Sequence, residues 1–261
     1  MGSDVQGTRL GSVLAAIGLL LVLTGPAAWA QAGAGRGRQG GPATPRAAAP
    51  VDLTGTWVSV VTEDWRWRMR TPPKGDFASL PLTEAAIKAA NAWDPARDAA
   101  AGEQCRGYGA PAVMRLPGRI RVAWEGDSTL KVETEAGTQT RLFHFTRPES
   151  PGKPGWQGIS VASWEAAGGR RGGAPRGGAL RVVTGHLRPG YLRKNGVPYS
   201  ANAQLTEYYN VVADETTQDT WLIVTAMVED AQYLSVPRFV TSSHFKKVDA
   251  AVWMPTPCEA E

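Results

Sequence analysis

Apolar and polar residues alternate through the segment 119–145, which two short turns divide into three parts. The first two parts, RIRVAWE (119–125) and TLKVETE (129–135), have the period of two that is typical of strands buried on one face. The turns GDS (126–128) and AG (136–137) are short enough to join antiparallel neighbours. The pattern predicts three consecutive antiparallel strands.

The register of the first hairpin follows from the pairing of its side chains. A three-residue turn at 126–128 sets Trp124 opposite Leu130 on one face. The same turn sets Arg121 opposite Glu133 on the other face, where the opposite charges attract. A two-residue turn would pair apolar residues with charged ones, so the three-residue turn is preferred.

The second hairpin leaves two registers open. A three-residue loop at 135–137, with its glycine in the left-handed conformation, turns His144 inward and Arg141 outward. The alternative two-residue loop requires a positive φ at Ala136 and buries Arg141 with Phe143. Because a positive φ is costly for alanine, the first register is preferred.

Similar apolar runs occupy most of the chain from residue 51 onward. We expect one short helix at 83–93, with Thr83 as its N-cap. About nine strands without βαβ alternation predict an all-β fold, an antiparallel meander that closes into a barrel, with a sandwich as the alternative. The further strands are predicted at 51–61, 159–165, 180–187, 204–212, 221–228 and 238–247.

The N-terminal part of the chain predicts export. Arg9, an apolar run at 13–23 and the A-x-A sequence at 28–30 have the order of a signal peptide. We expect cleavage after Ala30 and a periplasmic or secreted product without a stable membrane anchor. Residues 31–50 are rich in Gly, Ala, Pro and Arg and predict a disordered tether, which leaves 51–261 as a single folded domain.

Charge and cysteine content refine this picture. The formal net charge is +4, but three arginines lie in the predicted tether and the signal peptide is neutral, so the domain carries +1. This balance does not favour nucleic-acid binding. Cys105 and Cys258 are the two cysteines, and in an exported chain we expect them to form a disulfide, with two buried free thiols as the alternative.

Two stretches resemble known families. Gly55-Thr56-Trp57 on the first predicted strand resembles the G-x-W motif of lipocalin-like (calycin) barrels. In that family the tryptophan closes one barrel end, and the resemblance implies a cavity that holds a small apolar ligand. APAVMRLPG (110–118), the block 156–165 and the terminal cysteine are similar to a group of exported bacterial β-barrel proteins of unestablished function, which implies fold and export.

Three groups of residues are candidates for chemistry. His144, His186 and His244 lie near the ends of three predicted strands, and three imidazoles can hold zinc or another divalent metal. We expect at least two of them to line the barrel cavity. The run 65–68 (WRWR), if extended, offers a stacking wall of tryptophans and an anion clamp of arginines; the alternative is core tryptophans with solvent-exposed arginines. The loop 188–200 can place tyrosines over the barrel mouth.

The leading hypothesis is an exported lipocalin-like protein that binds a small, largely apolar molecule in a barrel cavity, without a cofactor and without nucleic acid. A secreted enzyme of hydrolase, lyase or isomerase type is the first alternative, with His186, Tyr191 and Glu207 as catalytic candidates, or with the histidines as metal ligands. An envelope structural protein without a ligand is the second. The candidate ligand-binding residues are Trp65, Trp67, Arg68, Arg141, His144, His186, Tyr191, Tyr199 and His244.

Overall fold

The computed structural model describes residues 43–150, 152–166, 177–249 and 251–260. The predicted signal peptide and residues 31–42 of the predicted tether lie outside these ranges. Among the described residues, no helix has the length and apolar character needed to cross a membrane. The helices are α1 (Trp65–Arg68), α2 (Glu84–Asn91), α3 (Pro95–Ala100) and α4 (Ala110–Val113), with 3-10 turns η1 (Gln104–Tyr108) and η2 (Ala136–Thr138).

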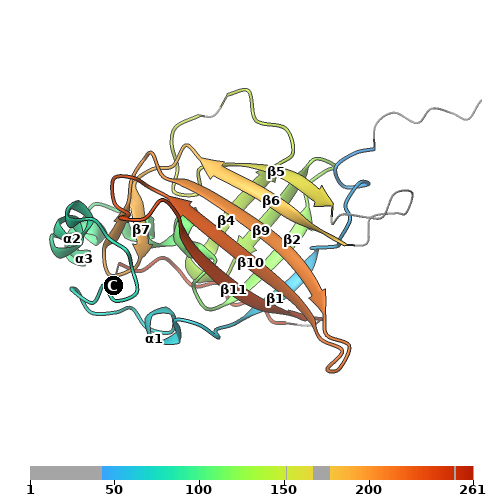
Figure 1. Ribbon diagram of the computed structural model, residues 1–261, viewed down its shortest axis with the longest axis horizontal. Helices are drawn as coiled ribbons and strands as arrows, with labels where there is room; N and C mark the ends of the chain where they lie inside the picture. The colour runs from blue at the N-terminus through green and yellow to red at the C-terminus, as the bar shows by residue number, and fades with distance from the viewer. Residues whose placement is uncertain (1–42, 151, 167–176, 250, 261) are drawn as a thin grey trace, which may run out of the picture. The chain divides into compact units, whose positions relative to one another are not determined.

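Nine of the described strands close into a barrel, as the sequence predicts (Figure 1). Their order around the barrel is β1-β11-β10-β9-β6-β5-β4-β3-β2, while β7 and β8 form a separate two-stranded sheet. The strands are β1 (Gly55–Val60), β2 (Arg119–Trp124), β3 (Thr129–Thr134), β4 (Gln139–His144), β5 (Ile159–Ala166), β6 (Gly178–Gly185), β7 (Gly190–Arg193), β8 (Val197–Tyr199), β9 (Gln204–Ala213), β10 (Thr220–Glu229) and β11 (Phe239–Val248).

One junction of the barrel departs from the predicted antiparallel meander. β4 and β5 run parallel, with Phe143 opposite Ser160 and His144 opposite Val161. Parallel neighbours need a connection that returns the chain to the end where it began. The long Pro- and Gly-rich segment after β4 supplies this return, so the barrel is mixed rather than purely antiparallel.

The first hairpin has the predicted register, and the second has the alternative one. Trp124 pairs with Leu130, as expected for the three-residue turn. In the second hairpin Val132 pairs with Arg141, and Arg141 is 1% exposed. The preferred register is wrong because the loop includes Thr138, which takes a positive φ of 50° beside Gly137 at 70°.

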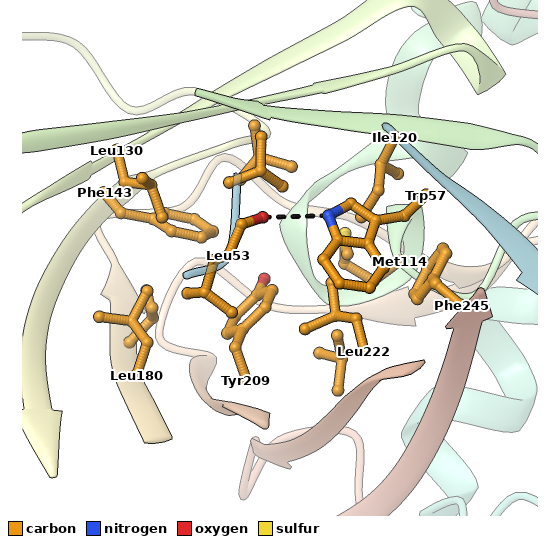
Figure 2. Packing of buried hydrophobic residues seen from close by; sticks show 14 of the residues in the cluster. Leu53, Trp57, Met114, Ile120, Leu130, Phe143, Leu180, Tyr209, Leu222 and Phe245 are labelled. Atoms are coloured by element: carbon orange, nitrogen blue, oxygen red, sulfur yellow. Dashed lines mark hydrogen bonds between the residues drawn. The ribbon is translucent and has the colours of Figure 1, made fainter. Parts of the chain in front are cut away.

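Side chains fill the end of the barrel that holds Trp57 (Figure 2). Each of the nine barrel strands contributes at least one residue to this buried cluster. Trp57 is fully buried, and its indole Nε1 donates to the carbonyl of Leu53 at 3.0 Å. Met114, which follows α4, and Leu222 of β10 also belong to the cluster. The tryptophan of the G-x-W motif is therefore part of a packed core.

A cap of short elements covers the other end of the barrel, where Figure 1 shows α2, α3 and β7 together. Thr83 caps α2 as predicted, accepting from the backbone N–H of Ala86 at 3.2 Å. Ala90 belongs to a second apolar cluster with Leu205 and Val228, whereas Ile87 is 40% exposed. The predicted loop 188–200 instead forms the β7–β8 hairpin, with Gly196 at φ 84°.

Both ends of the described chain contact the barrel. The predicted disulfide between Cys105 and Cys258 is present, and the backbone N–H of Thr256 donates to the carbonyl of Glu135 at 2.9 Å. Near the other end, the carbonyl of Pro45 accepts from the Trp164 indole at 2.7 Å. Pro45, which lies in the predicted tether, thus contacts the barrel strand β5.

Candidate functional site

Two adjoining hollows open beside the cap, between α1, the segment that follows it, and β7. The first, here called the inner hollow, has a volume of about 50 Å³. The second, here called the outer groove, is open to solvent and has a volume of about 910 Å³. Trp67, Arg70, Thr71 and Pro72 line both, so the two form one continuous site.

Cationic side chains dominate this site. Five line the inner hollow, and none of the described carboxylates lines it. The outer groove shares Arg70, adds two further cationic side chains, and has a single described carboxylate, that of Asp76. Such an excess of one charge favours an anionic ligand. The cations of the inner hollow are Arg68, Arg70, Arg115, Arg193 and Lys194, and those of the groove are Arg66, Arg70 and Lys74.

The run WRWR, expected to be extended, forms the single helical turn α1. The carbonyl of Asp64 accepts from the backbone N–H groups of Trp67 and Arg68, which closes the turn. In a helix, residues two apart point in different directions. Trp65 is therefore 66% exposed, while Trp67 lies half-buried in the site and Arg68 is buried. The two tryptophans do not share a wall.

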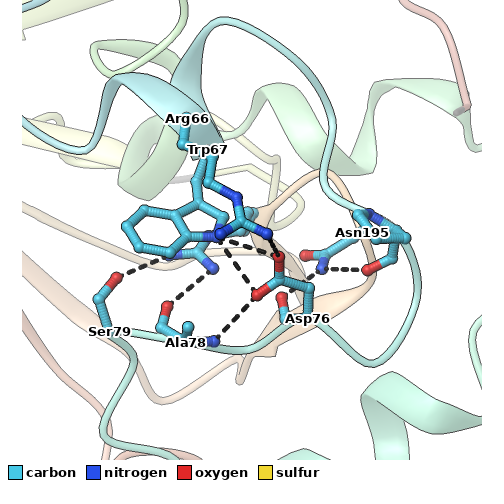
Figure 3. A network of polar contacts seen from close by, with 8 residues as sticks. Arg66, Trp67, Asp76, Ala78, Ser79 and Asn195 are labelled. Atoms are coloured by element: carbon cyan, nitrogen blue, oxygen red, sulfur yellow. Dashed lines mark hydrogen bonds and ion pairs between the residues drawn. The ribbon is translucent and has the colours of Figure 1, made fainter.

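Asp76 fixes the orientation of the Trp67 ring (Figure 3). The indole Nε1 lies 3.2 Å from each carboxylate oxygen of Asp76. Asn195 in the β7–β8 turn donates to the Asp76 carbonyl at 2.9 Å and so joins the groove to the cap. The guanidinium carbons of Arg66 and Arg193 lie 5.7 and 5.4 Å from the Trp67 ring centre, a cation–π distance.

The positive charge of Arg115 acts on two other guanidinium groups of the inner hollow, those of Arg68 and Arg193. Burial, together with the charge of Arg115, lowers the pKa of Arg193 to about 10. Burial and the same arginine also lower the pKa of Arg68. Arg115 donates through Nη2 to Asp64 at 2.6 Å, but its buried Nη1 has no partner among the described residues. A bound anion would offset this repulsion and accept from the unpaired donor.

The structure does not bring the three histidines together. His144 and His244 lie on the outer faces of their strands, since their neighbours Phe143 and Phe245 point into the core. His186 is half-buried just after β6, and its Nε2 lies 3.0 Å from the carbonyl of Gly152. The expectation that at least two line the lumen is wrong, in part because the second hairpin took the other register. No group of described His, Cys, Asp and Glu residues could hold a metal ion.

Arg141 and Glu207, two other candidates, meet inside the barrel. The guanidinium makes two hydrogen bonds to the carboxylate, at 2.9 and 2.5 Å, and Tyr209 donates to the same carboxylate at 3.1 Å. Burial alone would lower the pKa of Arg141, but Glu207 more than offsets this and raises it. Since Arg141 and Tyr209 occupy the carboxylate and both partners are buried, Glu207 is poorly placed to act as a catalytic base.

The two candidate tyrosines belong to the cap rather than standing over an open mouth. Tyr191 donates to the carboxylate of Asp98 at 2.6 Å, and burial together with this bond raises its pKa. Tyr199 is fully buried in the second apolar cluster. A raised pKa keeps both hydroxyls protonated near neutral pH, so Tyr191 is a donor rather than a base.

Trp67 and Arg68, two candidates that the sequence indicates, line the site, but most of its other residues were not predicted. Arg70 and Asp76 follow α1 closely, yet Arg115, Arg193 and Trp93 come from distant segments. A local signal existed only in the density of arginines around residues 66–70. The convergence of the other segments depends on how the cap folds over the barrel.

Comparison of the chain with protein-family models, curated proteins and solved structures gave no match. The described fold and site define a closed, mixed nine-stranded β-barrel with a cationic groove at its capped end.

Proposed function

We propose that this protein binds a small organic anion with a flat or apolar body, using the inner hollow and the outer groove together. The observation that carries this proposal is the set of five cations around a hollow that no described carboxylate lines. Arginine forks match carboxylate, sulfonate and phosphate groups, which can accept two hydrogen bonds at once.

The two parts of the site favour two parts of a ligand. The inner hollow, of about 50 Å³, has room for a compact charged group but not for a ring system. The outer groove is lined by Trp67 and Trp93 together with Pro72, Pro73 and Met69. These surfaces suit a planar or aliphatic body, because aromatic faces stack well and thioethers adapt to shape.

The groove replaces the barrel cavity as the proposed site of the apolar ligand. The core cluster fills the barrel at Trp57, and Arg141 and Glu207 pair with each other in the interior. Within the proposal, the closed barrel and buried Trp57 are consistent with a lipocalin-like origin, with the ligand held outside the lumen. Export to the periplasm or beyond is part of the same proposal, supported by the A-x-A sequence and the disulfide.

Binding is proposed in preference to catalysis because other groups of the protein already contact the side chains that were candidates for catalysis. Glu207 is held by Arg141, and Tyr191 by Asp98. His186 lies at the strand end beside Gly152. The binding site as proposed uses protein donors alone and requires no metal.

The test compares two fluorescent probes of similar body and different charge. Anilinonaphthalene sulfonate carries an anionic group on an aromatic body, and N-phenylnaphthylamine lacks that group. We expect the sulfonate to bind saturably, with an affinity that falls as salt rises, and the neutral amine to bind at least about tenfold more weakly. Equal binding of both, insensitive to salt, would contradict an anion site and favour an apolar cavity.

A further inference from the structure

A third hollow lies in the cap, separate from the inner hollow, and here it is called the tyrosine hollow. Its volume is about 210 Å³, and α2, α3, η1 and the β7–β8 hairpin supply its walls. Trp93 lines both this hollow and the outer groove. Its other walls include Tyr191, Tyr199 and Tyr233, so aromatic rings surround the space.

Glycines at two positions allow the aromatic rings to approach this closely. A Cβ at Gly196 would lie 2.3 Å from the Cβ of Trp93, and Gly196 also has a positive φ of 84°. A Cβ at Gly190 would lie 2.5 Å from the hydroxyl of Tyr199. The hydroxyl of Tyr199 is therefore next to a residue that itself lines the hollow.

The charges of the tyrosine hollow balance, unlike those of the groove. Its two carboxylates belong to Asp94 and Asp98, and its two guanidinium groups to Arg97 and Arg106. Arg106 pairs with Asp98 at 3.0 Å and lies over the Tyr191 ring at 4.6 Å. A balanced set of charges gives no preference for an anion, but it retains both donors and acceptors.

Two residues that line this hollow, Tyr199 and Arg106, each carry a buried donor without an acceptor among the described residues, the Tyr199 hydroxyl and the Arg106 Nε. A buried donor without a partner costs free energy that a ligand oxygen can recover. On the acceptor side, Oδ1 of Asp94 is used by the backbone of α3, which leaves Oδ2 for an incoming donor. The hollow thus offers donors, one acceptor and aromatic faces around a neutral space.

We infer that the tyrosine hollow binds the ring of a neutral sugar. A pyranose has apolar C–H faces that pack on aromatic rings, and hydroxyls that both accept and donate hydrogen bonds. Its ring and hydroxyl oxygens accept from Tyr199 and Arg106, and a hydroxyl donates to Asp94. This site is independent of the proposed anion site, although Trp93 forms a wall of each.

The experiment is saturation-transfer NMR and calorimetry of the purified protein with methyl glycosides of glucose, galactose, mannose and N-acetylglucosamine, each tested alone. We expect at least one to bind and to weaken by about tenfold in Tyr199→Phe, the loss that one hydrogen bond to a buried donor supports. Because that hydroxyl has no acceptor among the residues that the structure describes, the melting temperature of Tyr199→Phe should stay the same or rise. Tyr208→Phe, at a half-buried position on β9 outside this hollow, is the matched control and should bind normally.

A second variant, Tyr233→Ala, removes an aromatic wall that is only half-buried and should also weaken binding without unfolding the cap. Arg70→Glu should leave sugar binding unchanged while it weakens anion binding by at least about tenfold, so the two proposals fail separately. Absence of binding by all four glycosides overturns the inference. So does binding that survives unchanged in both Tyr199→Phe and Tyr233→Ala.

Discussion

Arg141 and Glu207 form a doubly hydrogen-bonded ion pair across the interior of the barrel, with Nη2 2.5 Å from Oε2 and Nη1 2.9 Å from Oε1. Arg141 lies on β4 and Glu207 on β9, with β5 and β6 between them in the barrel order. Both side chains are buried, at 0% and 1% exposure. The pair therefore links two walls of the barrel that share no backbone hydrogen bonds.

We expect Arg141→Met to destabilise the protein strongly, because it leaves Glu207 as an uncompensated buried charge. The free energy of unfolding should fall by about 3–5 kcal/mol, measured by urea denaturation. Arg181→Met, on an outward position of β6 beside Glu165 at 3.8 Å, is the control and should cost less than about 1 kcal/mol.

The double variant Arg141→Met with Glu207→Leu should recover most of the lost stability, since it removes both charges together. A single variant no less stable than the wild type would show that the pair is not held as described. A double variant that loses more unfolding free energy than the two single variants together would also show that Arg141 and Glu207 do not stabilise each other as described.

Arg70→Glu tests the groove without touching the core. Arg70 is exposed at the rim shared by the inner hollow and the outer groove. We expect unchanged stability within about 0.5 kcal/mol and a loss of anilinonaphthalene sulfonate affinity of at least about tenfold, because one attractive charge becomes repulsive. Arg147→Glu, an exposed arginine outside the site, gives the same change in net charge and should bind nearly as the wild type does. Equal losses of affinity in both variants would show that the net charge of the protein, rather than a site at Arg70, attracts the probe.

Asp76 should act on binding through the position of Trp67 rather than through its charge. Asp76→Asn keeps an acceptor for the indole Nε1 and removes a negative charge from the groove, so sulfonate affinity should stay equal or rise. Asp76→Ala removes the acceptor as well, and its affinity should be about tenfold below that of the Asn variant. The fluorescence anisotropy of the bound probe should fall in the Ala variant only. Identical affinities in the Asn and Ala variants would show that Asp76 does not affect binding by positioning Trp67.

The disulfide should contribute a large share of stability, because it closes a sequence separation of 153 residues. The double variant Cys105→Ser, Cys258→Ser should lose on the order of 4–5 kcal/mol of unfolding free energy by the loop-entropy model. In unreduced, unfolded wild-type protein, thiol titration should detect no reactive cysteine. Two reactive thiols per chain would contradict the bond.

The sequence predicts the barrel well because strand periodicity and side-chain pairing are local. Trp124 and Leu130 face each other as expected, since both members of the pair lie within one hairpin. The second hairpin escaped this reasoning because Thr138 adopts a left-handed conformation that its residue type disfavours. The register that results buries Arg141, and its partner Glu207 lies 66 residues away, beyond any local pattern.

The site was far less predictable for a related reason. Trp67 and Arg68 stand out in the sequence, but the helical turn that separates Trp65 from Trp67 depends on Asp64 at a positive φ of 53°. Arg115 and Arg193 join the same hollow only after α4 and the β7–β8 hairpin fold onto the barrel end. Contacts between distant segments of this kind carry no spacing that a single sequence reveals.

The indole N–H signals of the tryptophans distinguish a ligand bound in the groove from one bound in the barrel. Nitrogen-15 NMR of the purified protein, titrated with naphthalene carboxylate and assigned by single Trp→Phe variants, reports each ring separately. We predict saturable shifts at Trp67 and Trp93, which line the groove, and none at Trp57, whose Nε1 donates to the Leu53 carbonyl in the barrel core. A shift at Trp57 with Trp67 and Trp93 unmoved would contradict this prediction and place the ligand in the lumen.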